Sequence, residues 1–177
     1  RNTKTYIIDP SKPQEEPKVI FDRNYQDQYN NPGDFDVVKN EAGRYVLKLE
    51  GENGFLVGDG YRADGQFPFV DQYDFKNLKT KRIFESAYTD KKLNISRIIN
   101  PKKGEFLVSL QSATEYPNYY ILNTKKRVAP QPVTFFKNPF ESIAGVYKEV
   151  INYKRKDGVE LSATLYLPAD YDREAKT

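Results

Sequence analysis

The stretch FPFVDQYDFKNLKTKRIFE, residues 67–85, decides the fold class. It begins with an extended run rich in aromatic and β-branched residues, 67–75, turns through 76–79, and ends in a second short run, Arg82–Glu85. Aromatic and β-branched side chains suit a pleated, half-buried surface, and Asn is typical of turns. The stretch therefore predicts two antiparallel strands joined by a short turn.

The same shape occurs three times in the chain. A strand with paired aromatic or aliphatic residues, an Asp or Asn, a Lys-rich turn and a short strand describe 6–21, 73–84 and 120–128. A repeated supersecondary unit of this kind is typical of architectures in which each unit buries its faces against its neighbours. The repeat therefore favours a row of similar antiparallel sheets.

The spacing of the repeat indicates its size. Tyr6, Tyr73 and Tyr120 hold equivalent places, 67 and 47 residues apart. The second spacing is close to the roughly 40–50 residues of a β-propeller blade, and insertions at 24–34 and 58–65 account for the longer one. We predict an all-β fold: a partial β-propeller of about two to three antiparallel blades with a C-terminal β-hairpin. The alternative is a closed sandwich or barrel built from similar hairpins.

Period-2 runs bounded by turn residues fill most of the chain. We expect at most one short turn of helix, in 137–144, because no segment shows an apolar period of 3.6 residues. The further predicted strands are 5–9, 18–21, 35–38, 44–49, 55–57, 95–99, 105–110, 118–122 and 127–129.

The chain changes character after residue 145. Strands predicted at 146–153 and 159–167 flank the charged turn KRKDG, in which Asp-Gly is a favoured hairpin dipeptide. A lone hairpin is at best marginally stable without partner strands. We therefore predict two parts: 1–145 with the blades, and 146–177 as the first strands of a truncated domain.

The chain contains no His and no Cys. A Ser-His-Asp or Cys-His arrangement cannot be assembled from these residues, and no disulfide or Cys-based zinc site can form. We predict no catalytic residue, no metal site and no cofactor in this chain. These absences do not fix the compartment, although for a bacterial chain we favour a periplasmic or secreted location.

Charge and hydropathy argue against two classes of partner. The net charge is +3, from 28 basic and 25 acidic residues, and the basic clusters are short and lie beside turns. Such clusters are typical of solvated turns, so we predict no nucleic-acid partner. No apolar run reaches the length of a membrane-spanning helix, so we predict no membrane partner. Open sheet edges could instead pair two copies of the chain as a homo-dimer.

A resemblance to a known family is carried by YKRKDGVELSATLYLPADYD, residues 153–172. This segment resembles the junction where the propeller of prolyl oligopeptidase family serine peptidases enters the α/β-hydrolase domain. Stretches at 1–10, 21–33 and 68–74 resemble the glutamyl endopeptidase branch, so the resemblance spans nearly the whole chain.

The resemblance implies a Ser nucleophile in a Gly-x-Ser-x-Gly elbow, followed by Asp and then His. No Ser in this chain is flanked in that way, so we expect that machinery beyond Thr177 and carry over no catalytic residue. The propeller of such enzymes caps the active site and limits access to peptides. We predict this non-catalytic gating role for 1–145, with a peptide substrate and the remainder of the same polypeptide as partners. The alternative is a free-standing β-rich module that binds a protein or a glycan.

The Gly-flanked loop at 58–65 holds the candidate site residues. We predict that Arg62 and Tyr61 contact substrate, because a guanidinium suits the carboxylate of a Glu side chain; the alternative is an exposed loop Arg. Asp59 and Asp64 do not have the alternate spacing of a calcium-binding loop, so we interpret them as turn residues.

Overall fold

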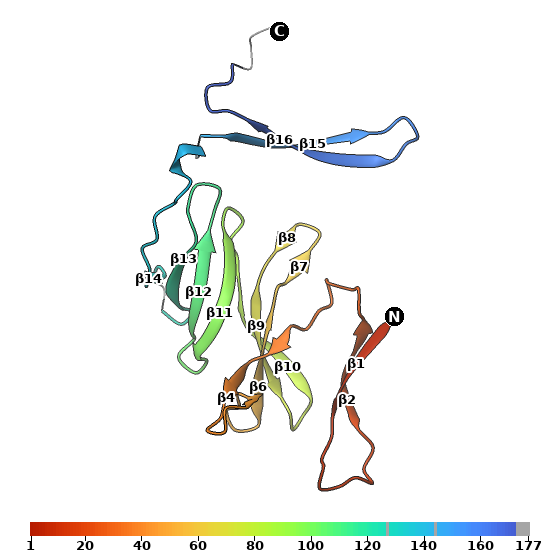
Figure 1. Cartoon of the computed structure of the whole chain (residues 1–177). Coiled ribbons are helices and arrows are strands. Elements are labelled where there is room, and N and C mark those ends of the chain that lie inside the picture. The colour runs from red at the N-terminus through yellow and green to blue at the C-terminus, as the bar shows by residue number, and fades with distance from the viewer. Residues whose placement is uncertain (127, 144, 173–177) are drawn as a thin grey trace. The chain divides into compact units, whose positions relative to one another are not determined.

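The computed structural model describes residues 1–126, 128–143 and 145–172, and it is dominated by strands (Figure 1). Across this described part, the strands form two four-stranded sheets and four two-stranded ladders, all antiparallel, and none closes into a barrel. A single 3₁₀ turn, Glu141–Ile143, is the helical element of the described residues. The predicted all-β class is confirmed.

Two compact units make up the chain, Arg1–Phe136 and Lys137–Thr177. The predicted boundary after residue 145 falls inside the second unit and stays a prediction. No helix among the described residues is long and apolar enough to cross a membrane.

The first four-stranded sheet is a meander, in which each strand pairs with the next one along the chain. Two small ladders are inserted between its strands and leave this order intact. The meander consists of β3 (Asp34–Phe35), β6 (Asn53–Gly58), β9 (Phe69–Asp74) and β10 (Lys79–Glu85). The inserted ladders pair β4 (Val37–Lys39) with β5 (Tyr45–Leu47), and β7 (Tyr61–Arg62) with β8 (Gly65–Gln66).

The second four-stranded sheet is also a meander. It consists of β11 (Lys92–Asn100), β12 (Glu105–Gln111), β13 (Asn118–Asn123) and β14 (Gln131–Pro132). Both meanders end in open edges, and the predicted pairing of two copies through such edges stays a prediction.

The fourth strand of the second meander corrects the sequence-based prediction. It lies at Gln131–Pro132, opposite Ile121 and Tyr120, and not at 127–129, of which residue 127 lies outside the described residues. The side-chain oxygen of Asn123 accepts hydrogen bonds from the backbone N–H groups of Lys125 and Lys126, at 3.1 and 3.0 Å. This turn lies where the sequence predicts it, but residues 128–130 form a bend and irregular backbone, so pairing with β13 begins only at Gln131.

The first meander buries both of its faces. Toward the second meander, Phe55 and Val70 join a core with Phe106, and Phe84 stacks on Phe106 with 5.5 Å between ring centroids. Toward the N-terminal hairpin of β1 (Asn2–Ile7) and β2 (Lys18–Asn24), Tyr73 meets Phe21 at 5.6 Å between centroids. The hairpin and the two meanders therefore form layers in chain order (Figure 1).

The second unit contains the predicted C-terminal hairpin. Its strands β15 (Tyr147–Lys154) and β16 (Glu160–Leu167) pair along their full length around the Asp157-Gly158 turn. Directly paired residues share a face. The register therefore places Ile151, Tyr153 and Leu161 on one face, and every residue of β15 is exposed.

Candidate functional site

Tyr61 and Arg62 lie in a two-residue strand, where the sequence had predicted a loop. They pair with Gln66 and Gly65. Phe67 donates its backbone N–H to the carbonyl of Gly60 at 2.9 Å and closes the hairpin. Gly60 has a φ of 63°, and a Cβ there would lie 1.9 Å from the Phe67 carbonyl oxygen, so only glycine fits. The two candidate side chains are thus held on a short hairpin inserted between β6 and β9.

Arg62 reaches from this hairpin to strand β10. Its Nη2 donates to Oε1 of Glu85, and its guanidinium lies 4.9 Å from the ring centroid of Phe67. Its side chain remains about half exposed, at 47%. Arg62, which the sequence predicts to contact substrate, is therefore already engaged with a carboxylate of its own chain, and its substrate role stays a prediction.

Glu85 also accepts from Arg82, which continues the contacts into the sheet. Arg82 Nε donates to Oδ1 of Asp71 at 2.5 Å, and its guanidinium lies 3.7 Å from the ring centroid of Phe69. Asp71 is buried, and a buried carboxylate is costly unless it is paired. Two arginines and two carboxylates therefore alternate along one line: Arg62, Glu85, Arg82 and Asp71.

The alternating charges set the protonation of this row. The hydrogen bond from Arg62 lowers the pKa of Glu85 below its ordinary value, burial opposes this, and the charges of both arginines add to the lowering. Burial acts to lower the pKa of Arg82, but the hydrogen bonds and charges of Asp71 and Glu85 outweigh it and raise that pKa. Glu85 and Arg82 are therefore both charged at neutral pH.

A shallow hollow of about 290 Å³ lies beside the row. One wall is the loop at 29–32, which Asp27 holds by accepting from the backbone N–H groups of Tyr29 and Asn30, each at 3.1 Å. The opposite wall contains Tyr61 and Arg62. A guanidinium carries five N–H donors, so Arg62 can bind a further acceptor while it holds Glu85. The hollow can bind and orient an acidic or polar group, but it presents no nucleophile with a base.

Sequence reasoning did not identify Asp71, Arg82 and Glu85 as members of this site. The pairing of Asp71 with Arg82 could have been predicted from the sequence. If the turn occupies 75–78, the register of the two strands places Asp71 in β9 opposite Arg82 in β10. The contact of Glu85 could not, since the register shifts between Arg82 and Phe84.

The two loop aspartates hold no cluster of metal ligands. Asp59 accepts from the Gln66 carboxamide at 3.3 Å. Among the described residues, no three His, Cys, Asp or Glu side chains come together in a way that could hold a metal ion.

Comparison with known proteins shows what this chain is similar to. It is 35% identical over 187 residues to a probable chloroplastic glutamyl endopeptidase of Oryza sativa subsp. japonica, and 35% identical over 189 residues to its counterpart in Arabidopsis thaliana. Each match covers 97% of this chain but only 20% and 19% of the relatives, so the chain spans about a fifth of their length. No protein-family model matches the chain.

Among solved structures, the chain is similar to a variant of the AtxE2 isopeptidase with Astexin3-dC4 bound. The TM-score is 0.37 at 17% identity, covering 77% of this chain and 20% of that one. A likeness at this level establishes no shared fold.

Proposed function

We propose, from the relationship of this chain to glutamyl endopeptidases along nearly its whole length, that it is a non-catalytic part of a serine endopeptidase and gates the access of peptides. The observation that carries this proposal is 35% identity over 97% of the chain. The absence of His supports the non-catalytic role, because the usual general base of a serine peptidase cannot come from these residues.

In this proposal the layers of the first unit are propeller blades. Two features support it: both meanders run in simple chain order, and Tyr73 and Tyr120 of the sequence repeat both lie in the third strand of their meander. The hairpin of β1 and β2 is then the last pair of strands of a preceding blade. Blades stacked about an axis would enclose a channel that admits peptides and excludes folded proteins.

The second unit supplies the link to the catalytic part. The apolar face of the β15–β16 hairpin, with the exposed Ile151 and Tyr153 and the half-buried Leu161, is the surface that a further part of the same polypeptide covers. A sheet of this size needs partner strands or a covering layer for independent stability. The relatives extend well beyond the matched region and so have chain to supply it.

Within this function, Arg62 and Tyr61 contact the substrate. An acidic side chain entering the hollow would share the Arg62 guanidinium with Glu85 or displace that carboxylate. Arg62→Ala in the natural polypeptide should raise KM for Glu-containing peptides, and Glu85→Gln should lower it, because the internal competitor is removed. Arg97→Ala, on an exposed position of β11, is the control and should leave KM unchanged. Equal KM values for all three variants would remove the substrate role of Arg62.

The activity assay separates the chain from the whole enzyme. The 177-residue chain should not hydrolyse Glu-containing peptide reporters, whereas the natural polypeptide that contains it should do so. Turnover by the chain alone would contradict the non-catalytic role.

A further inference from the structure

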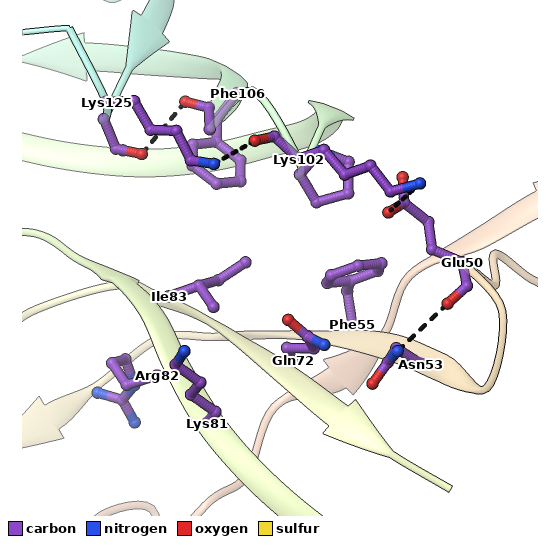
Figure 2. A pocket seen from close by; sticks show the side chains of 13 residues that line it. Glu50, Asn53, Phe55, Gln72, Lys81, Arg82, Ile83, Lys102, Phe106 and Lys125 are labelled. Atoms are coloured by element: carbon purple, nitrogen blue, oxygen red, sulfur yellow. Dashed lines mark hydrogen bonds and ion pairs between the residues drawn. The ribbon is translucent and has the colours of Figure 1, made fainter.

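A second hollow, of about 480 Å³, lies between the two meanders of the first unit (Figure 2). Phe106, Lys102 and Lys125 of the second meander form one side, and Phe55, Gln72 and Lys81 of the first meander form the other. Glu50, in the turn before β6, and Asn53, the first residue of β6, close one end. The hollow is distinct from the Arg62 site, which lies on the opposite face of the first meander.

The sheet register explains why the two meanders separate here. Direct pairing aligns Phe55, Gln72 and Lys81 in one row across β6, β9 and β10. The adjacent row toward the core, with Val57 and Val70, is apolar and packs against the second meander. Along the row of Phe55, Gln72 and Lys81 the side chains change from the buried Phe55 to the polar Gln72 and Lys81, and the hollow lies where these two polar side chains take the place of apolar packing.

Positive charge predominates around this space. The Lys125 ammonium donates a hydrogen bond to the backbone carbonyl of Lys102. The Lys102 Nζ lies 3.8 Å from Oε2 of Glu50. Lys81 has no ion-pair partner anywhere in the described part of the chain. Glu50 is the one carboxylate among the described lining residues, against the three lysines. Arg82 also borders the space, but its guanidinium is held by Asp71 and Glu85.

A neutral donor faces the same space. The Gln72 carboxamide is half buried in the central strand β9, and it makes no side-chain hydrogen bond to any described residue. The Gln72 amide is free to donate to an added acceptor, and a hollow lined mostly by ammonium groups attracts anions. We propose that this hollow binds a compact polyanion that carries phosphate or carboxylate groups.

Each lysine that lines the hollow has another lysine close by in the sequence that lies outside it. These neighbouring lysines supply a matched control. The lining variant is Lys81→Gln with Lys102→Gln and Lys125→Gln. The control variant is Lys79→Gln with Lys103→Gln and Lys126→Gln, which removes the same charge from the same strand and turns but outside the hollow. All six lysines are exposed, so both variants should fold.

The experiment titrates each form of the 177-residue chain with pyrophosphate and, separately, with citrate at constant ionic strength, and follows backbone amide resonances by NMR. The unmodified chain should bind at least one of the two anions saturably, with shifts at Gln72, Gly104 and Thr124. The lining variant should bind about tenfold more weakly and the control as well as the unmodified chain. Preference for pyrophosphate identifies phosphate as the ligand group, and preference for citrate identifies carboxylate.

Two results would overturn the proposal: equal weakening in both variants, which is the result of unspecific attraction to a basic surface, or no saturable shift with either anion. Neither result bears on peptidase activity, so the gating function is tested separately.

Discussion

The first meander and the C-terminal hairpin are built from the same kind of alternating strand, yet the central strands of the meander are buried and the hairpin has no buried residue. Leu56 and Val70 of the first meander have no exposed surface, whereas Val150 of β15 is 59% exposed. The meander has a layer on each face, and the hairpin has exposed residues on both. Alternation therefore specifies a strand, but burial is decided by what the rest of the chain brings against it.

The largest expected effect compares a core ring with a hairpin side chain. Phe106→Ala removes a ring that is 1% exposed, and we expect a loss of roughly 3–5 kcal/mol in the free energy of unfolding. Ile151→Ala, at 41% exposure, should change it by no more than about 0.5 kcal/mol. Urea unfolding followed by circular dichroism measures both. A comparable loss for Ile151→Ala would mean that the hairpin face is buried in solution.

A smaller effect is expected from two glycines with similar backbone angles. Gly33 and Gly158 have φ values of 83° and 86°, but a Cβ on Gly33 would lie 2.3 Å from the Val57 carbonyl oxygen, whereas that on Gly158 meets nothing. Gly158→Ala should cost the hairpin about 1–2 kcal/mol of backbone strain and leave the main thermal transition unchanged. Gly33→Ala should lower that transition, because β6 must also move. An unchanged Tm for Gly33→Ala would contradict this packing.

The smallest effect concerns pH and the charged row. The pKa of Glu85 is lower in the folded chain than its ordinary value of 4.5. The resulting stabilisation is present above pH 4.5 and is lost as the pH falls through the lower folded value.

Glu85→Gln should therefore reduce the loss of stability between about pH 5 and about pH 3. Glu41→Gln, in the exposed loop between β4 and β5, is the control. Urea unfolding at each pH measures the free energy of unfolding of both variants. If it falls equally with pH in Glu85→Gln and Glu41→Gln, the charged row adds no stability.

Local features of the fold were predictable because they depend on neighbours in the sequence. The hairpin around Asp157-Gly158 and most strands of both meanders follow from alternation and turn residues. The strand predicted at 35–38 is an exception, because the structure divides it between β3 and β4, which lie in different sheets. The fourth strand of the second meander was misplaced: the turn at 123–126 was predicted, but the irregular residues 128–130 that follow it were taken as part of the strand.

The contacts of the sites were less predictable, because they join distant segments. Arg62 and Glu85 are 23 positions apart, and Lys81, Lys102 and Lys125 come from one strand and two turns. Each lysine alone is typical of a solvated surface. Only the stacking of one meander on the other brings them around a common space, and no local pattern encodes that stacking.

Amide hydrogen exchange on the 177-residue chain is the most direct test of the contrast between the stacked layers and the hairpin. The amides of β6, β9 and β12 should exchange only through global unfolding, and those of β15 and β16 through local opening that is far more frequent. Protection of β16 equal to that of β12 would contradict the contrast between the buried strands of the meanders and the exposed strands of the hairpin.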